Sequence, residues 1–213
     1  MEKIELETVC IPVSVIRRLP RYLTEAQRLC QEGVEWVSSA ILAKTLGLTS
    51  STVRQDLSYI DFKGISKRGY SAIGLETALA RTLGVDRDVV CLLVGAGNLG
   101  RALSMHEGFA RQGFKIVGVF DNNPAIVGKK IGRFTVQGMD DIAPHVAAGT
   151  VDIGIISVPH DAAQDVADLL IKAGVRGLLN MTTAHLQVPE TVSVVDVRIL
   201  LSLRELAYRV RSR

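Results

Sequence analysis

A glycine-rich turn is the part of the sequence whose residue types and spacing point most directly to chemistry. Residues 95–100 have the spacing G-x-G-x-x-G and directly follow the apolar run Val89–Val94. In such a turn the first glycine makes the bend, the second lets backbone approach a pyrophosphate, and the third lets a helix pack on the strand. Backbone N–H groups and the positive helix end favour the anion. The predicted phosphate site consists of Gly95, Ala96, Gly97, Asn98, Leu99 and Gly100.

An acidic residue follows at the spacing of a ribose-binding carboxylate. Asp121 ends the next apolar run and follows Gly100 by 21 residues, close to the ~20 expected. A carboxylate bonds both ribose hydroxyls of NAD but repels the 2′-phosphate of NADP, and the neighbouring Asn122 adds no basic group. NAD(H) is therefore the predicted cofactor. The alternative is a structural glycine turn followed by a solvated acid.

The elements that must position this turn alternate between strand and helix. Strands are predicted at 89–94, 115–121, 153–158, 177–181 and 192–197, and helices at 98–112, 161–173 and 199–210, with irregular pieces around 139–147. This alternation is typical of a parallel sheet covered on both faces, an α/β Rossmann domain. Val158 and Pro159, at the turn after the third strand, are predicted to border the cofactor.

The residues before this domain have helical spacing and predict a winged helix-turn-helix. A helix is expected over 13–31 with Pro20 as a kink or a fresh start, followed by helices at 40–46 and from 49–51 to about 60. The short turn at Gly47 gives helix-turn-helix spacing, and 65–71 has the pattern of a short hairpin, the wing. Arginine and glutamine read base edges, and hydroxyls and cations hold phosphates. The predicted DNA-binding residues are Ser51, Thr52, Arg54, Gln55, Ser58, Lys63, Lys67 and Arg68.

Composition limits the class of protein. The 213 residues carry a net charge of +3, so a basic surface has to be local. Cys10, Cys30 and Cys91 form no pair motif, and Cys91 is expected in the core. No leader and no apolar run of ~18 residues is present, so a cytoplasmic protein without membrane contact is expected. The four histidines have no metal-ligand spacing, and little chain remains for a substrate domain, so neither a metal site nor an enzyme is predicted.

The last helix predicts a subunit contact. Ile199, Leu203, Leu206 and Val210 form one apolar stripe, which must be covered either by the chain's own sheet or by a partner. A partner is favoured because helix-turn-helix proteins commonly bind two half-sites as dimers. The predicted domains are 1–84 for DNA binding, 85–197 for NAD(H) binding and 198–213 for dimerisation.

Several local patterns together resemble one family, the Rex redox-sensing transcriptional repressors. The resemblance runs through nearly the whole chain and is far more specific than any single motif. It includes IPVSVIRRLPRYL at 11–23, VSSAILAKTLGL at 37–48, VRQDLSYI at 53–60, KRGY at 67–70, VGAGNLGRAL at 94–103, GF at 108–109, FDNNPAIVGKKI at 120–131, SVPHDAAQDVADLL at 157–170 and GVRGLLNMT at 174–182.

The resemblance implies a homodimer with swapped C-terminal helices that binds palindromic operator DNA and senses the NADH/NAD+ ratio. It implies that NADH closes the dimer and releases the operator, whereas NAD+ permits DNA binding. On this sequence it assigns the pyrophosphate to Gly95, Gly97 and Gly100, the adenosine ribose to Asp121, and the recognition-helix arginine to Arg54.

The sequence departs from the family pattern at one polar cluster. His106 stands where the family has a tyrosine near the nicotinamide, Arg198 where it has an aspartate that pairs with that tyrosine, and Thr24 where it has an arginine. The family also has a basic residue at the position of Gln55. One hypothesis is a repressor that responds to the NADH/NAD+ ratio. The alternatives are a repressor with a weak or absent NADH response and, from another class, a small NAD-dependent oxidoreductase.

Overall fold

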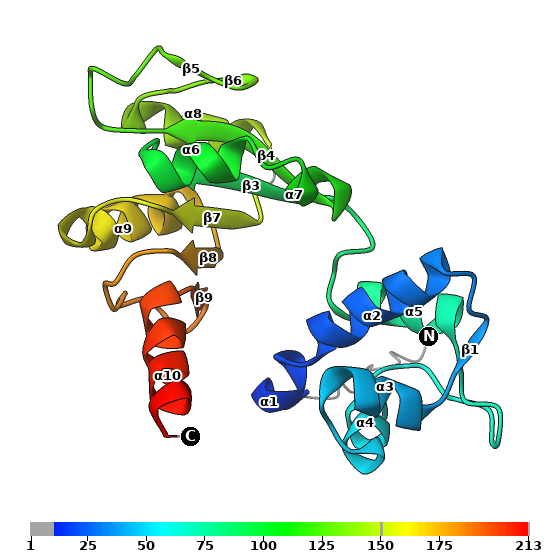
Figure 1. Cartoon of the computed structure of the whole chain (residues 1–213). Coiled ribbons are helices and arrows are strands. Elements are labelled where there is room, and N and C mark those ends of the chain that lie inside the picture. Colours follow the sequence, from blue (N-terminus) through cyan, green and yellow to red (C-terminus); the bar gives the residue numbers. More distant parts are fainter. Residues whose placement is uncertain (1–10, 150, 213) are drawn as a thin grey trace. The chain divides into compact units, whose positions relative to one another are not determined.

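The chain separates into two compact units, Met1–Arg87 and Asp88–Arg213 (Figure 1). The computed structural model describes residues 11–149 and 151–212, so Cys10 lies outside the described residues. The domain limits predicted from the sequence, with a separate segment at 198–213, remain a prediction. No helix in the described ranges is long and apolar enough to cross a membrane.

Unit 1 is built mainly from helices around one apolar core. Its largest fully buried side chains include Leu19, Tyr22, Leu42 and Leu75. Pro20 lies in the first turn of a helix, where its missing N–H costs nothing, so it marks a fresh start rather than a kink. The elements are α1 Val13–Ile16, α2 Leu19–Gln31, β1 Trp36–Val37, α3 Ser39–Leu46, α4 Ser50–Leu57, β2 Tyr70–Ser71 and α5 Ala72–Thr82.

The helix-turn-helix is confirmed at α3 and α4. The Ser38 hydroxyl caps α3 by accepting a hydrogen bond from Ile41 N at 3.2 Å, and Gly47 ends the helix at φ +66°. The Thr49 hydroxyl then caps α4 by accepting from Thr52 N at 3.1 Å. The second helix ends at Leu57, earlier than the predicted end near residue 60.

The wing is a short hairpin tied to the start of the helix pair. Ile65 and Gly69 form an antiparallel bridge, and β2 pairs antiparallel with β1. Gly69 has φ +94°, and a Cβ there would lie 2.4 Å from the Val37 carbonyl oxygen. Only glycine allows this close approach, which fixes the wing beside the N-terminus of α3.

Unit 2 is a five-stranded parallel sheet in the order β4-β3-β7-β8-β9. All five predicted strands are present, with ends shifted by two residues or less. They are β3 Val89–Val94, β4 Phe114–Phe120, β7 Ile153–Ile156, β8 Gly177–Asn180 and β9 Ser193–Asp196. The chain moves from β3 to β4 on one side and later returns to β7 on the other. The switch point of the sheet therefore lies between β3 and β7, where α/β folds bind ligands.

Two apolar clusters cover the two faces of this sheet. One joins Leu92 and Ile156 to α9 (Ala163–Ala173), and the other joins Leu93 and Ile155 to α6 (Asn98–Ser104) and α7 (Gly108–Arg111). Cys91 is buried, as predicted. The remaining elements are α6 Asn98–Ser104, α7 Gly108–Arg111, β5 Lys130–Ile131, β6 Phe134–Thr135, η1 Met139–Asp141, α8 Ile142–Ala148, η2 His160–Ala162, α9 Ala163–Ala173 and α10 Ile199–Arg211.

The predicted single helix over 98–112 is wrong. The chain leaves the helix after Ser104 and resumes at Gly108. The His106 ring folds over Gly108, where an added Cβ would lie 2.6 Å from His106 Nε2. The glycine therefore makes room for this break.

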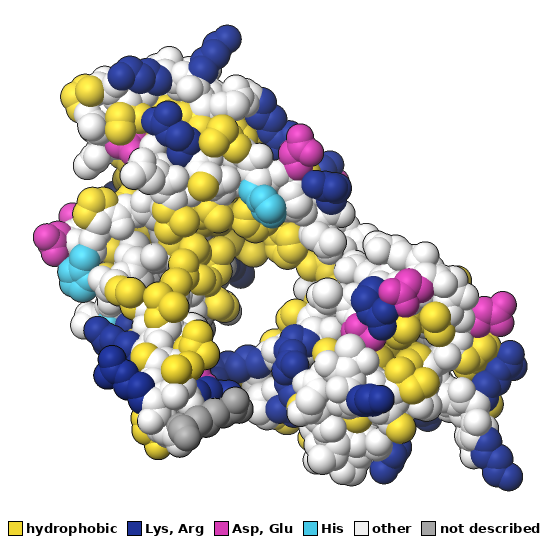
Figure 2. All heavy atoms as spheres, viewed as in Figure 1, with side chains coloured by type: hydrophobic (Ala, Val, Ile, Leu, Met, Phe, Trp, Pro, Cys, Tyr) yellow, Lys and Arg dark blue, Asp and Glu magenta, His cyan; other side chains and the backbone are white. Residues whose placement is uncertain are grey.

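The C-terminal helix α10 does not fold back onto its own sheet. All of its described residues are exposed, including Leu203 at 54% and Leu206 at 56%. Figure 2 shows its apolar side chains, in yellow, lying among arginines.

Candidate functional site

The three glycines of the turn have different surroundings. Gly95 has φ +101°, and a Cβ there would lie 2.2 Å from the Ser157 carbonyl oxygen. At Gly100 a Cβ would lie 1.8 Å from the Gly95 carbonyl oxygen, so α6 packs directly on the turn. At Gly97 it would meet nothing within 4 Å. Two glycines therefore close the turn, while the middle one leaves open space at the N-terminus of α6 that a pyrophosphate fits.

Asp121 is held against this turn by its carboxylate. One oxygen accepts a hydrogen bond from Ala96 N at 2.7 Å, and the other accepts from Asn123 N at 2.8 Å. Each oxygen keeps a free lone pair. The side chain is half-buried beside an exposed Asn122. The structure thus brings the acid and the glycine turn together, in the arrangement that a phosphate and an adjoining ribose require.

The turn after β7 completes the edge of the site. The Val158 Cγ1 atom would lie 3.0 Å from a Cβ at Gly95, so Val158 packs on the glycine turn. Pro159 caps η2 and is exposed. Next to it, His160 Nδ1 lies 3.1 Å from Thr183 Oγ1, which links the ends of β7 and β8.

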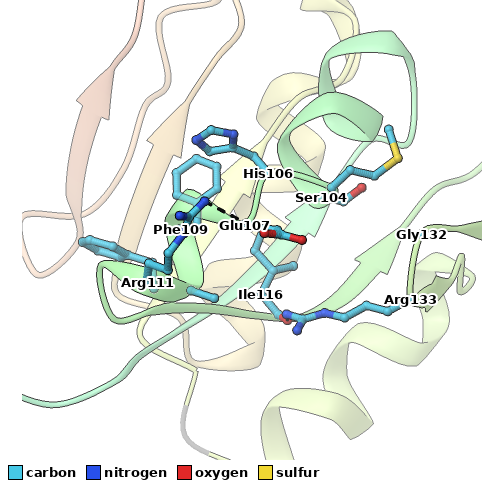
Figure 3. A pocket seen from close by; sticks show the side chains of 11 residues that line it. Ser104, His106, Glu107, Phe109, Arg111, Ile116, Gly132 and Arg133 are labelled. Carbon is cyan, nitrogen blue, oxygen red and sulfur yellow. Dashed lines mark hydrogen bonds and ion pairs between the residues drawn. The ribbon is translucent and has the colours of Figure 1, made fainter.

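His106 lies away from the glycine turn within the chain. It follows the C-terminus of α6, whereas the turn forms the N-terminus of the same helix. It lines a pocket of about 580 Å³ with Phe109, Ile116 and Arg133 (Figure 3). Its ring meets Phe109 edge-on, with 5.3 Å between the ring centroids.

A second pocket lies at the carboxyl ends of β8 and β9, and we call it the Arg198 pocket. It has a volume of about 400 Å³. Its residues come from four separate parts of the sequence, and Leu99 alone among them was predicted to bind the cofactor. The lining consists of Leu99, Met181, Thr182, Thr183, Val197, Arg198, Ile199, Leu200, Leu201 and Arg204. Within residues 11–149 and 151–212, no group of three or more His, Cys, Asp or Glu side chains is placed to hold a metal ion.

The candidate nucleic-acid interface combines α4 with the wing. Arg54 is exposed, and its Nη1 lies 3.3 Å from the Ser39 hydroxyl oxygen. Arg54, Lys67 and Arg68 line one pocket of about 380 Å³. Arg68 lies over the Trp36 ring, 3.9 Å from its centroid. The structure thus gathers three of the predicted cations, whereas Lys63 is exposed outside this pocket.

The hydroxyls predicted to bind DNA have partners within α4. Ser51 and Thr52 each lie 2.8 Å from the Thr49 hydroxyl oxygen. The Ser58 hydroxyl donates to the Gln55 carbonyl oxygen at 2.7 Å. The exposed Arg54 and Gln55 side chains are therefore better placed than these hydroxyls to reach a base edge.

A buried acid on the inner face of α4, Asp56, was not among the residues predicted from the sequence. Asp56 is 1% exposed and receives two hydrogen bonds from Arg18, at 2.6 and 2.7 Å, and one from Tyr22 at 2.7 Å. Burial alone would raise the pKa of Asp56, but the hydrogen bonds from Arg18 and Tyr22 outweigh it and hold that pKa below its ordinary 3.8. This ion pair fixes α4 to α2.

Comparisons with known proteins find matches to both units. A family model described as "CoA binding domain" matches residues 86–184, and one described as "Putative DNA-binding protein N-terminus" matches residues 10–58. The redox-sensing transcriptional repressor Rex of Carboxydothermus hydrogenoformans is 41% identical, over 94% of this chain and 97% of that protein. Rex of Caldicellulosiruptor saccharolyticus is 36% identical, over 95% of this chain and 93% of that protein.

The chain belongs to the Rex family. Its relatives in that family are named as transcriptional repressors and not as enzymes. A solved structure of RSP in complex with beta-NAD+ and operator DNA matches with a TM-score of 0.90 and 35% identity, over 95% of this chain and 94% of that one. RSP in complex with beta-NADH matches with a TM-score of 0.85 and 36% identity, over 95% of both chains. A winged helix-turn-helix followed by a Rossmann-like domain is thus the Rex architecture.

The three departures from the Rex pattern are divided between the two units. Thr24 is exposed on α2 in unit 1, and its hydroxyl donates to the Pro20 carbonyl oxygen at 3.1 Å. His106 and Arg198 both lie in unit 2 but line different pockets. Within unit 2, His106 and Arg198 therefore do not share one pocket.

Proposed function

We propose that this protein is a transcriptional repressor that binds NAD(H) and whose operator binding responds to the cellular NADH/NAD+ ratio. The observation that carries the proposal is the pairing of the glycine turn and Asp121 with a winged helix-turn-helix, in a chain that matches RSP bound to beta-NAD+ and operator DNA along both units. Since it would act on DNA and sense a metabolic cofactor, we place it in the cytoplasm.

The residues around the glycine turn fit the cofactor. The open space at Gly97 and the N-terminus of α6 would receive the pyrophosphate, with Ala96, Asn98 and Leu99 supplying backbone beside it. The carboxylate of Asp121 would accept hydrogen bonds from the adenosine ribose, with Asn122 next to it. When bound, NAD(H) supplies a redox-dependent charge on its nicotinamide ring. Val158 and Pro159 would border the cofactor. His106 would lie near the cofactor only when two chains form a dimer.

The recognition surface fits a palindromic operator read by a homodimer. Arg54 and Gln55 would contact base edges, while Ser51, Thr52, Ser58 and the wing residues Lys63, Lys67 and Arg68 would contact the backbone. The uncovered apolar stripe of α10 supports a partner subunit, because such a helix is not stable in water alone. Two copies would present two recognition helices to two half-sites.

A second candidate function keeps DNA binding and makes the NADH response weak. It rests on the residue types Thr24, His106 and Arg198, which cannot reproduce the hydrogen bonds of a tyrosine–aspartate–arginine cluster. Titration of operator affinity against NADH and NAD+ separately distinguishes the two. Selective release by NADH supports the first function, and equal operator affinity at all NADH/NAD+ ratios supports the second.

The placement of the recognition helix is tested by Arg54→Ala, with Arg81→Ala on α5 as the matched control. Loss of one base-reading arginine costs about 1–3 kcal/mol per half-site. We therefore expect operator affinity to fall at least about tenfold for Arg54→Ala and to remain unchanged for Arg81→Ala, measured by fluorescence anisotropy. Unchanged binding by Arg54→Ala would contradict the proposed interface.

A further inference from the structure

The Arg198 pocket is positively charged. Its described lining includes two guanidinium groups, of Arg198 and Arg204, and no carboxylate. The other lining groups are aliphatic side chains, one methionine and two threonines. A cation that enters this pocket would therefore be repelled, whereas a neutral or anionic group would not.

Arg198 is held in place but only partly neutralised. Its Nη2 donates to the Ala184 carbonyl oxygen at 3.2 Å and to an Asp196 oxygen at 3.3 Å. The other Asp196 oxygen accepts from Asn180 Nδ2 at 2.7 Å, so this carboxylate is shared. Arg198 Nε is buried and has no acceptor among the described residues. Its unpaired Nε adds no neutralising contact, so Asp196 is the one carboxylate among the described residues that offsets the charge of Arg198.

The sheet order places this pocket on the far side of the glycine turn from Asp121. Asp121 follows β4, on one side of β3, whereas the pocket lies at the ends of β8 and β9, on the other side. Leu99, in the first turn of α6, belongs to both the phosphate turn and the pocket. A dinucleotide with its adenosine at Asp121 and its pyrophosphate at Gly97 therefore directs its nicotinamide end toward the Arg198 pocket.

We propose that Arg198 is a specificity-determining residue that makes this pocket select the nicotinamide-end group by charge. The neutral dihydronicotinamide of NADH is accepted. So is a pyridinium ring that carries a carboxylate, as in the nicotinic acid analogue of NAD+, because the two charges cancel. The cationic ring of NAD+ is disfavoured. The inference rests on the proposed binding of NAD(H) and adds the physical property that the site reads.

The nicotinic acid analogue separates charge from redox state. It is an oxidised ring, so a site that reads reduction treats it like NAD+. A site that reads charge treats it like NADH. Two unit charges several ångströms apart in a partly exposed pocket interact by about 1–1.4 kcal/mol, which corresponds to about a five- to tenfold change in affinity.

The experiment measures the affinity of the full-length protein by calorimetry for NADH, NAD+, the nicotinic acid analogue and ADP-ribose. ADP-ribose has no nicotinamide ring, so it reports only the glycine turn and Asp121. The variants are Arg198→Gln, which removes the charge, and Arg198→Lys, which keeps it. Arg176→Gln is the control, because it removes the same charge from an exposed residue that precedes β8, at the opposite edge of the sheet.

In the unmodified protein we expect both NADH and the analogue to bind about five- to tenfold more tightly than NAD+. Arg198→Gln should raise NAD+ affinity by about the same factor and remove the advantage of the analogue, with ADP-ribose unchanged. Arg198→Lys and Arg176→Gln should keep the original order. The proposal is overturned if the analogue follows NAD+ throughout, or if Arg198→Gln leaves the order unchanged. Failure of ADP-ribose to bind would instead overturn the proposed cofactor function itself, and this inference with it.

Discussion

At the scale of single residues, the glycine turn separates binding from folding. Gly95 and Gly100 are needed by the chain itself, because an added Cβ at either would collide with a backbone oxygen. Gly97 has no such neighbour, so its missing side chain serves only whatever approaches from outside. The same motif therefore contains positions of two physical kinds.

Substitution of the second and third glycines should have opposite effects. Gly97→Ala should leave the thermal unfolding midpoint nearly unchanged and weaken NADH binding at least about tenfold, because its methyl group occupies the phosphate space. Gly100→Ala should destabilise unit 2 by several kcal/mol, since a contact of 1.8 Å cannot be accommodated. Calorimetric titration and thermal denaturation check the pair. Normal NADH affinity in Gly97→Ala would show that the phosphate lies elsewhere.

The buried Asp56 predicts an acid-sensitive anchor of the recognition helix. Asp56→Ala leaves Arg18 without its partner and should lower the free energy of unfolding by about 3 kcal/mol. The exposed Asp61→Ala should change it by less than about 0.5 kcal/mol. Because the pKa of Asp56 is lowered in the folded state, the stabilisation is complete above its ordinary value of 3.8 and is lost as pH falls through the folded-state pKa. Denaturant unfolding at a series of pH values should show that the free energies of unfolding of the unmodified protein and of Asp56→Ala become equal at acidic pH. A constant difference at every pH would rule out the ion pair as the cause.

Sequence spacing predicted some site residues and missed others for a physical reason. Gly95–Gly100 and Asp121 occupy neighbouring strand ends at a fixed separation, so spacing was enough to place them. Thr182, Thr183 and Arg204 reach the same edge only through the order in which strands pair, which local spacing does not contain. Nothing in the local sequence marks Asp56 as buried, because its burial depends on Arg18 and Tyr22, which are distant in the sequence.

At the scale of elements, helix caps and apolar runs were sufficient to predict most helices and strands from the sequence. Interruptions within a helix could not be predicted in this way. Ser38, Thr49 and Gly47 fix the helix pair locally, so its limits could be read from the sequence. The interruption between α6 and α7 depends on how His106 packs over Gly108, and helical spacing continues across it. The helix α5 was not assigned from the sequence. Its buried Leu75 and Leu79 complete the core of unit 1.

The wing should depend on one glycine. Gly69→Ala places a methyl group 2.4 Å from the Val37 carbonyl oxygen at a positive φ, so the wing must move away from α3. We expect operator affinity to fall about tenfold or more, because the wing loses its contacts with the DNA phosphate backbone. NADH affinity should be unchanged. Gly33→Ala is a suitable control, since Gly33 also has a positive φ, +74°, but an added Cβ there would meet nothing within 4 Å. Equal losses in both variants would point to general destabilisation instead.

At the scale of the whole molecule, α10 is a helix whose apolar face is exposed in the single chain. Its stripe is apolar and uncovered, with Ile199 at 61% and Val210 at 68% exposure. Its sequence predicted this stripe, and the structure excludes cover by the chain's own sheet. Which residues pack on this stripe depends on how subunits assemble, and the sequence of the helix alone does not predict it.

Charge placed on the stripe should separate the subunits. Leu203→Glu with Leu206→Glu should convert a dimer to a monomer in sedimentation velocity, because a buried unpaired carboxylate costs several kcal/mol. Ser212→Glu, just past the end of α10 and outside the apolar stripe, should keep the dimer. Operator affinity should fall with the loss of the second half-site contact, whereas ADP-ribose binding should persist. A dimer that survives both glutamates would place the interface elsewhere.

The uncovered helix also has a genetic consequence. A chain with a damaged recognition surface, such as Arg54→Ala, keeps α10 intact and can still pair with a normal chain. Such a mixed pair has one functional recognition helix and one damaged recognition helix. In a cell that makes both versions, the altered copy would therefore titrate the normal one, and its allele would behave as dominant. An allele that also carries the two glutamates on α10 would be recessive, since its product could no longer join the functional pool.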